Sequence, residues 1–242
     1  MAVTSPPPGQ SSPDYAAASR AALVEALLAA GPGMPTLCEG WRTEHLAAHV
    51  HLRETSPMAA GLVVPGLRHR LERRTQELGD AHATDRSYAE LVALVERGPL
   101  GDPDRTRGVG TRLRDLAAGA RGTAAGSRLA HRIQLLEFFI HTEDVRRAQG
   151  SWAPRILADA YADTLYTHLR ERARLLYRGE ETGVVLRRRP RPASRTDNTP
   201  FTARTAGDDG VVVTVSGPVG ELALHAFGRR RAALVMEDRT RA

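Results

Sequence analysis

Residues 135–148 read LLEFFIHTEDVRRA, and the fold is decided by this stretch. It contains neither glycine nor proline, and Gly150 lies just past its end, which predicts a helix. Glu137 and His141 are four residues apart and therefore share one face of that helix. Large apolar residues flank both, and burying a carboxylate and an imidazole there is costly unless they are paired or bound. The spacing is typical of two metal ligands on one helical turn, and equally of a Glu–His hydrogen bond inside a helix bundle.

A second stretch, TLCEGWRTEHLAAHV at residues 36–50, runs from a glycine-containing loop into another helix. Thr43 is the expected N-cap, because its hydroxyl can accept a hydrogen bond from the first turn. His49 then lies nearly two turns into the helix, among apolar neighbours. It is our candidate for a third metal ligand, supplied by a different helix from the first two.

The motifs CEGW…LAAHV and EFFIHTEDVRRA together resemble the DinB-like, mycothiol-dependent maleylpyruvate isomerase superfamily, and within it an actinobacterial branch of metal-binding proteins. The resemblance implies an up-down helix bundle that holds a divalent metal, with zinc as first choice, through His49, Glu137 and His141. It also implies the thiol mycothiol as a cofactor. Two positions depart from the family: His45 stands where relatives have an acidic residue, and Thr142 where many have a second histidine.

Three further side chains lie close to these motifs in the sequence. Arg53 follows His49 by one helical turn and is the candidate for binding the cofactor or an anionic substrate, although a surface arginine is the commoner case. Asp144 could accept the other ring N–H of His141, but we favour an exposed partner for the arginines that follow it. Cys38 is interpreted as a small buried residue rather than a nucleophile, because no His–Asp arrangement near it in the sequence argues for activation.

The composition is that of a globular protein. The 242 residues, 41% hydrophobic and 26% charged, suffice for one sizeable core, or for one domain plus a small second one. All 34 basic residues are arginine, which with the abundant alanine and glycine reflects codon usage in a GC-rich genome. The single cysteine, Cys38, excludes an intramolecular disulfide. We expect a cytoplasmic protein, since neither a signal peptide nor a membrane segment is visible.

The hydrophobic pattern divides the chain into three parts. Residues 1–13 have the composition of a disordered tail, and residues 14–178 carry helical patterns. After Gly179 the period changes to that of strands. We therefore expect an α+β fold, with a DinB-like bundle at 14–178 and a small α+β C-terminal domain at 183–242 that is only loosely coupled to metal binding. The expected elements of that domain are strands at 184–186, 201–203, 211–215 and 232–236, and a helix at 219–227.

Three functions are compatible with these features. The first is a metal-dependent transferase or isomerase, in which a metal-bound thiol adds to an electrophilic substrate. The second is a non-catalytic metal-binding or stress-response protein on the same bundle. The third, nucleic-acid binding through the arginine runs at 187–191 and 229–231, is the least favoured because few aromatic residues accompany them. The zinc-protease order H-E-x-x-H is absent from the sequence, and nickel or iron would suit the same ligands as zinc.

Overall fold

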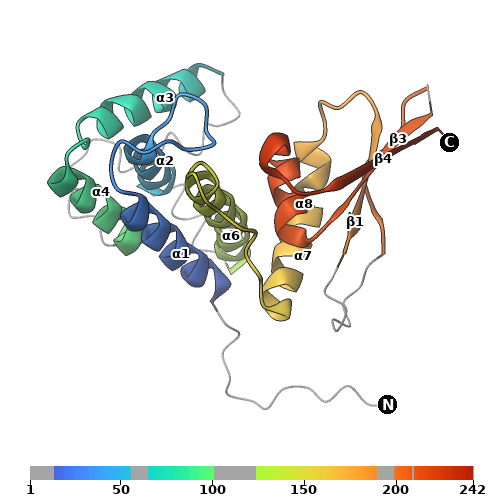
Figure 1. Cartoon of the computed structure of the whole chain (residues 1–242), viewed down its shortest axis with the longest axis horizontal. Coiled ribbons are helices and arrows are strands. Elements are labelled where there is room, and N and C mark those ends of the chain that lie inside the picture. The colour runs from blue at the N-terminus through green and yellow to red at the C-terminus, as the bar shows by residue number, and fades with distance from the viewer. Residues whose placement is uncertain (1–13, 56–64, 101–123, 190–198, 209, 242) are drawn as a thin grey trace, which may run out of the picture.

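A computed structural model of the chain describes residues 14–55, 65–100, 124–189, 199–208 and 210–241 (Figure 1). The predicted α+β fold is confirmed: a group of helices is followed by a four-stranded sheet with helices against it. The expected tail at 1–13 lies outside the described residues. The helices are α1 (Tyr15–Ala30), α2 (Thr43–Thr55), α3 (Pro65–Asp80), α4 (Asp85–Arg97), α6 (Ala124–Arg146), α7 (Asp159–Leu176) and α8 (Val219–Ala226), and the strands are β1 (Gly183–Arg188), β2 (Phe201–Arg204), β3 (Val211–Gly217) and β4 (Met236–Arg241).

Local sequence signals fix the start of several helices. The side chain of Asp14 accepts a hydrogen bond from the amide of Ala17 and caps α1, as its residue type predicts. Thr43 has a different role from the predicted N-cap: it lies inside α2, and its hydroxyl donates to the carbonyl of Gly31 at 2.6 Å. This bond joins the start of α2 to the end of α1 and so closes the loop that carries Cys38. Among the described helices, none is both long and apolar enough to cross a membrane.

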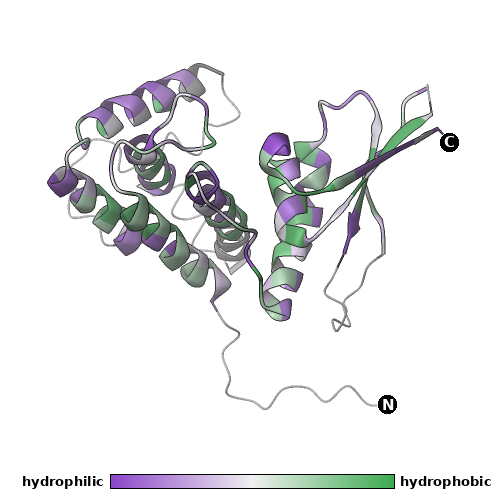
Figure 2. Cartoon of the chain, viewed as in Figure 1, coloured by the Kyte–Doolittle hydropathy of each residue, from purple (hydrophilic) through white to green (hydrophobic). Residues whose placement is uncertain are grey.

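Helix α6 is buried on two sides. Phe138 and Val145 pack into a core with α1, α2 and α4, whereas Leu135, Phe139 and Ile140 pack into a second core with α7, α8 and the sheet. Figure 1 shows α6 between these two groups, and Figure 2 shows apolar residues on the inner faces of both. The double burial explains why the stretch 135–148 is apolar on more than one face, and it places Glu137 and His141 in the middle of the molecule.

The sheet has the strand order β2-β1-β3-β4. Strands β1 and β3 are parallel, and the two outer pairs are antiparallel. Val184, Leu186 and Val215 are buried in the same core as α7 and α8. Helix α8 approaches α6 closely at Gly220, where a Cβ atom would lie 2.9 Å from the ring of Phe139. A side chain there would have to displace the buried ring of Phe139, so the glycine allows α8 to pack closely against α6.

The last strand lies further along the chain than the sequence predicted. Residues 230–232 form a 3₁₀ turn, and β4 begins at Met236 rather than at 232. The amide of Leu234 donates to the side chain of Glu221 at 2.8 Å, and the amides of Ala232 and Ala233 bond to the carbonyl of Arg229. The backbone amides of residues 232–234 thus already have hydrogen-bond partners in α8 and in the turn, and strand pairing starts only after them.

The hydrophobic pattern of residues 154–178 predicts a helix with Pro154 in its first turn, but α7 begins only at Asp159. Residues 154–158 precede the helix, and Ala158 is extended. Arg155 explains the difference, because its guanidinium bonds to Glu143 at 2.6 Å and stacks on the ring of Phe139 at 4.5 Å. These contacts with α6 hold the segment along that helix and override its local preference.

Buried ion pairs join α6 to α8. Arg147 donates to both carboxylate oxygens of Glu221, at 2.9 and 2.6 Å, and to Glu143 at 2.6 Å. The side chains of all three are at most 4% exposed. These pairs tie α8 to the end of α6, and the expected loose coupling of the C-terminal domain to metal binding stays a prediction. The division into domains at 14–178 and 183–242 stays a prediction.

We predict that Glu221→Gln lowers the free energy of unfolding by about 3 kcal/mol, because it leaves the charge of Arg147 buried and only partly paired. Glu90→Gln is the matched control, since Glu90 pairs with Arg86 on an exposed face of α4. It should cost less than about 1 kcal/mol. Urea unfolding of both variants measures the difference, and equal small losses would show that the α6–α8 pair does not hold the two parts together.

Candidate metal centre

A cavity of about 940 Å³ opens where α2, α6 and the segment after α8 meet. Ligand pockets in proteins commonly have volumes of this order. All three predicted metal ligands and Arg53 lie on its wall. The lining residues are Leu37, Cys38, Glu39, Trp41, His49, Arg53, Glu72, Glu137, Ile140, His141, Phe227, Gly228, Arg229, Arg230, Arg231 and Ala232.

The structure brings His49, Glu137 and His141 together from two helices. The rings of His49 and His141 are 5.4 Å apart between centroids, nearly perpendicular to each other. The Nε2 atom of His141 lies 3.6 Å from a carboxylate oxygen of Glu137. That nitrogen is buried and makes no hydrogen bond within the described part of the chain. Its partner is thus the carboxylate of Glu137, at ion-pair distance, and Nε2 is the ring atom that a metal held together with Glu137 would use.

Arg53 reaches the site from α2, as the sequence hypothesis requires. Its guanidinium lies 3.0 Å from Oε2 of Glu137, and that of Arg172 on α7 lies 3.7 Å from the other oxygen. Burial by itself would raise the pKa of Glu137, but the interactions with His141 and Arg53 outweigh burial and lower the pKa to about 2. Glu137 is therefore a carboxylate at neutral pH, the form in which it can bind a cation.

His49 is held as a neutral imidazole. Burial lowers its pKa well below the ordinary value, and the charges of His141 and Arg53 lower it further. The ring lies against the indole of Trp41, with 4.7 Å between the centroids. A neutral imidazole keeps a lone pair for a metal, and the contact with Trp41 restricts the orientation of the ring.

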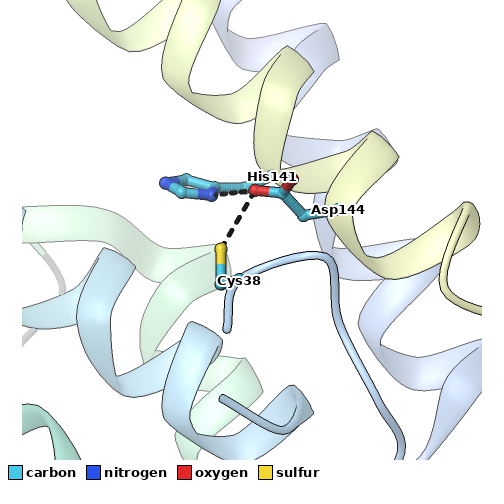
Figure 3. A group of neighbouring side chains, drawn as sticks. All are labelled: Cys38, His141 and Asp144. Atoms are coloured by element: carbon cyan, nitrogen blue, oxygen red, sulfur yellow. Dashed lines mark hydrogen bonds and ion pairs between the residues drawn. The ribbon is translucent and has the colours of Figure 1, made fainter. Parts of the chain in front are cut away.

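The other ring nitrogen of His141, Nδ1, contacts the carboxylate of Asp144, which we had expected to be exposed. Asp144 is completely buried, and its Oδ2 lies 3.0 Å from Nδ1 of His141 (Figure 3). The interpretation of Asp144 as an exposed partner for the neighbouring arginines is therefore wrong, and the alternative we had set second is correct. The thiol of Cys38 also contacts Oδ2, at 3.3 Å, so this half-buried cysteine lies beside the candidate site rather than in an inert core.

Arg229, from the segment after α8, closes this side of the histidine. Its Nε and Nη2 donate to the two oxygens of Asp144 at 2.8 and 2.7 Å, and Nη2 lies 3.2 Å from the sulfur of Cys38. Burial would raise the pKa of Asp144, but the hydrogen bonds from His141 and Arg229 outweigh it and hold the pKa well below its usual range. The carboxylate is thus ionised and already neutralised by a guanidinium.

The set of possible metal-ligand atoms that lie close together in the described part of the chain is on this second side of His141. Cys38, His141 and Asp144 offer ligand atoms within 4.8 Å of one another. Arg229 already contacts both Cys38 and Asp144, so a positive charge stands where a second cation would have to bind. A guanidinium is also present on the Nε2 side, where Arg53 lies 3.0 Å from Oε2 of Glu137, the oxygen that faces His141. A guanidinium therefore stands on each side of His141, and a metal bound by His49, Glu137 and His141 stays a prediction.

His141 itself carries a proton when no metal is present. Burial would lower its pKa, but interactions with Asp144, Cys38 and Glu137 outweigh burial and raise the pKa well above its usual value. A metal that binds Nε2 would displace the proton on that nitrogen, while the proton on Nδ1 remains hydrogen-bonded to Asp144.

The two departures from the family motif lie away from this cavity. Nδ1 of His45 accepts from the amide of Arg42 at 3.1 Å, and Nε2 lies 3.0 Å from Asp80 at the end of α3. The hydroxyl of Thr142 donates to the carbonyl of Phe138 at 2.7 Å, within α6. His45 thus joins α2 to α3, Thr142 bonds within its own helix, and neither contacts Glu137 or His141 through these bonds.

No pattern in the sequence indicated the role of Arg229. It lies 85 residues from Asp144, inside a run of arginines that we had considered for nucleic-acid binding. In the structure, Arg229 pairs with Asp144, Arg230 with Glu180 and Arg188 with Asp163. These arginines form ion pairs within the chain. The sequence could not distinguish them from other arginines, because every basic residue of the chain is arginine.

The fold is similar to that of solved enzymes. Two crystal structures resemble the chain, that of the mycothiol-dependent maleylpyruvate isomerase and that of a variant of it in which one histidine is replaced by alanine. Each is 20% identical in sequence, with a TM-score of 0.51 over 93% of this chain and 90% of the other. No protein-family model and no curated protein matches the sequence. The likeness shows the fold, and it extends over both the helices and the sheet.

We predict that Arg53→Met raises the pKa of Glu137 from about 2 toward the ordinary value of 4.5, because the carboxylate loses its nearest positive charge. Arg172→Met, the matched control, should raise it less, since that guanidinium is further away. A carbon-13 NMR titration of the Glu137 carboxyl in metal-free protein measures both values. Equal shifts in the two variants would contradict this electrostatic assignment.

Proposed function

We propose that the chain is a divalent-metal protein that uses a low-molecular-weight thiol, mycothiol by the resemblance, as a transferase or isomerase. The proposal is carried by one observation: Nε2 of His141 is buried without a hydrogen-bond partner in the described residues, beside Glu137 and His49. A metal ion bound there would give this nitrogen a closer partner than the carboxylate of Glu137, which lies 3.6 Å away.

The donor set fits zinc. Two imidazoles and one carboxylate are the ligands of several catalytic zinc sites, which keep a further position open for water or substrate. Nickel and iron accept the same ligands, so geometry and availability decide among these metals. Asp144 would hold the second ring nitrogen of His141, as carboxylates commonly do for metal-bound histidines.

A metal held by these residues would favour the thiolate form of a coordinated thiol, which is otherwise mostly protonated at neutral pH. The protein's own side chains would do the rest. Glu137 and the neutral His49 would bind the metal, and Arg53 would balance the charge of Glu137 while its exposed part faces an anionic substrate. The cavity of about 940 Å³ is large enough to hold a thiol and an electrophilic substrate together.

The likeness to the mycothiol-dependent maleylpyruvate isomerase supports this choice of thiol, because that enzyme shares the fold over most of both chains. At 20% sequence identity, this likeness does not identify the substrate of the chain. We therefore propose the reaction class, thiol addition to an electrophile followed by transfer or isomerisation, and leave the electrophile open.

We predict that tag-free protein binds about one divalent ion per chain. His49→Ala, Glu137→Ala and His141→Ala should each lower the zinc affinity at least 100-fold, because each removes a ligand. Cys38→Ala is the control that separates the two donor sets and should keep the affinity within a few-fold. Competition with a chromogenic chelator measures these values. If Cys38→Ala abolished binding while His49→Ala did not, the metal would lie on the Nδ1 side of His141.

We further predict that mycothiol binds to the metal-loaded protein and not to the metal-free protein. With cobalt in place of zinc, thiol addition should produce a sulfur-to-metal charge-transfer band, in Cys38→Ser as in the wild type, because the thiolate comes from outside the chain. Transfer of the thiol to model electrophiles then tests catalysis. Thiol binding without transfer would favour a non-catalytic metal-binding protein. Failure to bind the thiol would contradict the proposed dependence on a thiol.

A further inference from the structure

We propose that Arg229 and Asp144 are positioning residues, which hold His141 so that its Nε2 atom faces the metal site. This inference rests on the proposed function and extends it to the C-terminal part of the chain. Neither residue touches the metal in this proposal. They act through the hydrogen bond on the opposite ring nitrogen, Nδ1.

The first step is the orientation of the ring. Nδ1 of His141 lies 3.0 Å from Oδ2 of Asp144, and both side chains belong to α6. An imidazole turned by a half rotation would place its carbons where the nitrogens now lie and would lose this bond. Because Asp144 is completely buried, no water replaces the lost partner. The carboxylate therefore selects the ring orientation that presents Nε2 to Glu137 and His49.

The second step is the orientation of Asp144. Arg229 donates one N–H to each carboxylate oxygen, and this two-point contact fixes the plane of the carboxylate. It also supplies the charge without which a buried carboxylate would be protonated or would move.

The third step is the anchoring of Arg229. Its Nη1 donates to the carbonyl of Phe227 at 2.7 Å, and its amide donates to the carbonyl of Leu224 at 2.9 Å. Gly228, between Phe227 and Arg229, has a φ of +82°. This left-handed conformation allows the chain to reverse direction after α8. Arg229 is thus fixed to the end of α8, which is itself held to α6 by the pair of Glu221 with Arg147.

The metal site is consequently built from both parts of the chain. The helices supply the ligands, and the segment after α8 supplies the group that orients one of them. A protein in which α8 is correctly docked but Arg229 is changed should fold, yet it should bind the metal less well and with altered geometry.

The experiment compares Arg229→Gln and Asp144→Asn with Arg230→Gln as the matched control. Arg230 is the next residue and pairs with Glu180, not with Asp144. Zinc affinity is measured by chelator competition, well below the unfolding temperature of each variant as followed by circular dichroism. We expect losses of about 10- to 100-fold for Arg229→Gln and Asp144→Asn, the range found when partners of metal ligands are removed. Arg230→Gln should stay within about twofold of the wild type.

The cobalt-substituted proteins provide a second readout that simple destabilisation does not change. The ligand-field spectrum should shift in Arg229→Gln and Asp144→Asn, since the orientation of His141 changes, and Arg229→Lys should restore part of the wild-type spectrum. Wild-type affinity and an unchanged spectrum in folded Arg229→Gln would overturn this inference alone. A wild-type protein that binds no metal would overturn the proposed function and this inference with it.

Discussion

The double burial of α6 is the constraint on which the rest of the structure depends. Apolar residues on both sides of this helix enter separate cores, so its charged side chains have little access to water. Each of them must find a partner inside the protein, because an unpaired buried charge is far too costly to keep. Glu143 finds Arg147 and Arg155, Asp144 finds Arg229, and Glu137 finds Arg53.

These pairs also explain how the C-terminal part is positioned. Two of the partners of α6, Glu221 and Arg229, come from α8 and the segment after it. Buried ion pairs are weak evidence for stability, because the cost of removing charges from water consumes most of their attraction. Their geometric demands are strict, however. We infer that the pairs specify where α8 docks against α6, while the apolar contacts around Phe139 and Gly220 supply most of the favourable free energy.

The sequence predicted the helices and strands that are determined by local patterns. The helix with Glu137 and His141, the helix with His49 and the strands around Val184 and Val213 all follow from hydrophobic period and spacing. The sequence could not show Arg229 beside Asp144, because the two are 85 residues apart and no pattern links them. The same kind of long-range contact displaced the start of α7, through Arg155, and the start of β4, through Glu221. The errors therefore fall where tertiary contacts compete with local preference.

The position of Cys38 relative to the candidate metal site bears on which thiol could bind a metal there. A thiol near a metal centre competes with an external thiol for the open coordination position. Here the sulfur of Cys38 lies on the Nδ1 side of His141, in contact with Asp144 and Arg229. The candidate metal position lies on the Nε2 side, with the imidazole ring between the two. Hydrogen bonds to Asp144 and Arg229 give the Cys38 thiol partners away from the metal position that we propose, so under that proposal the chain's own sulfur would not take the place of an external thiol.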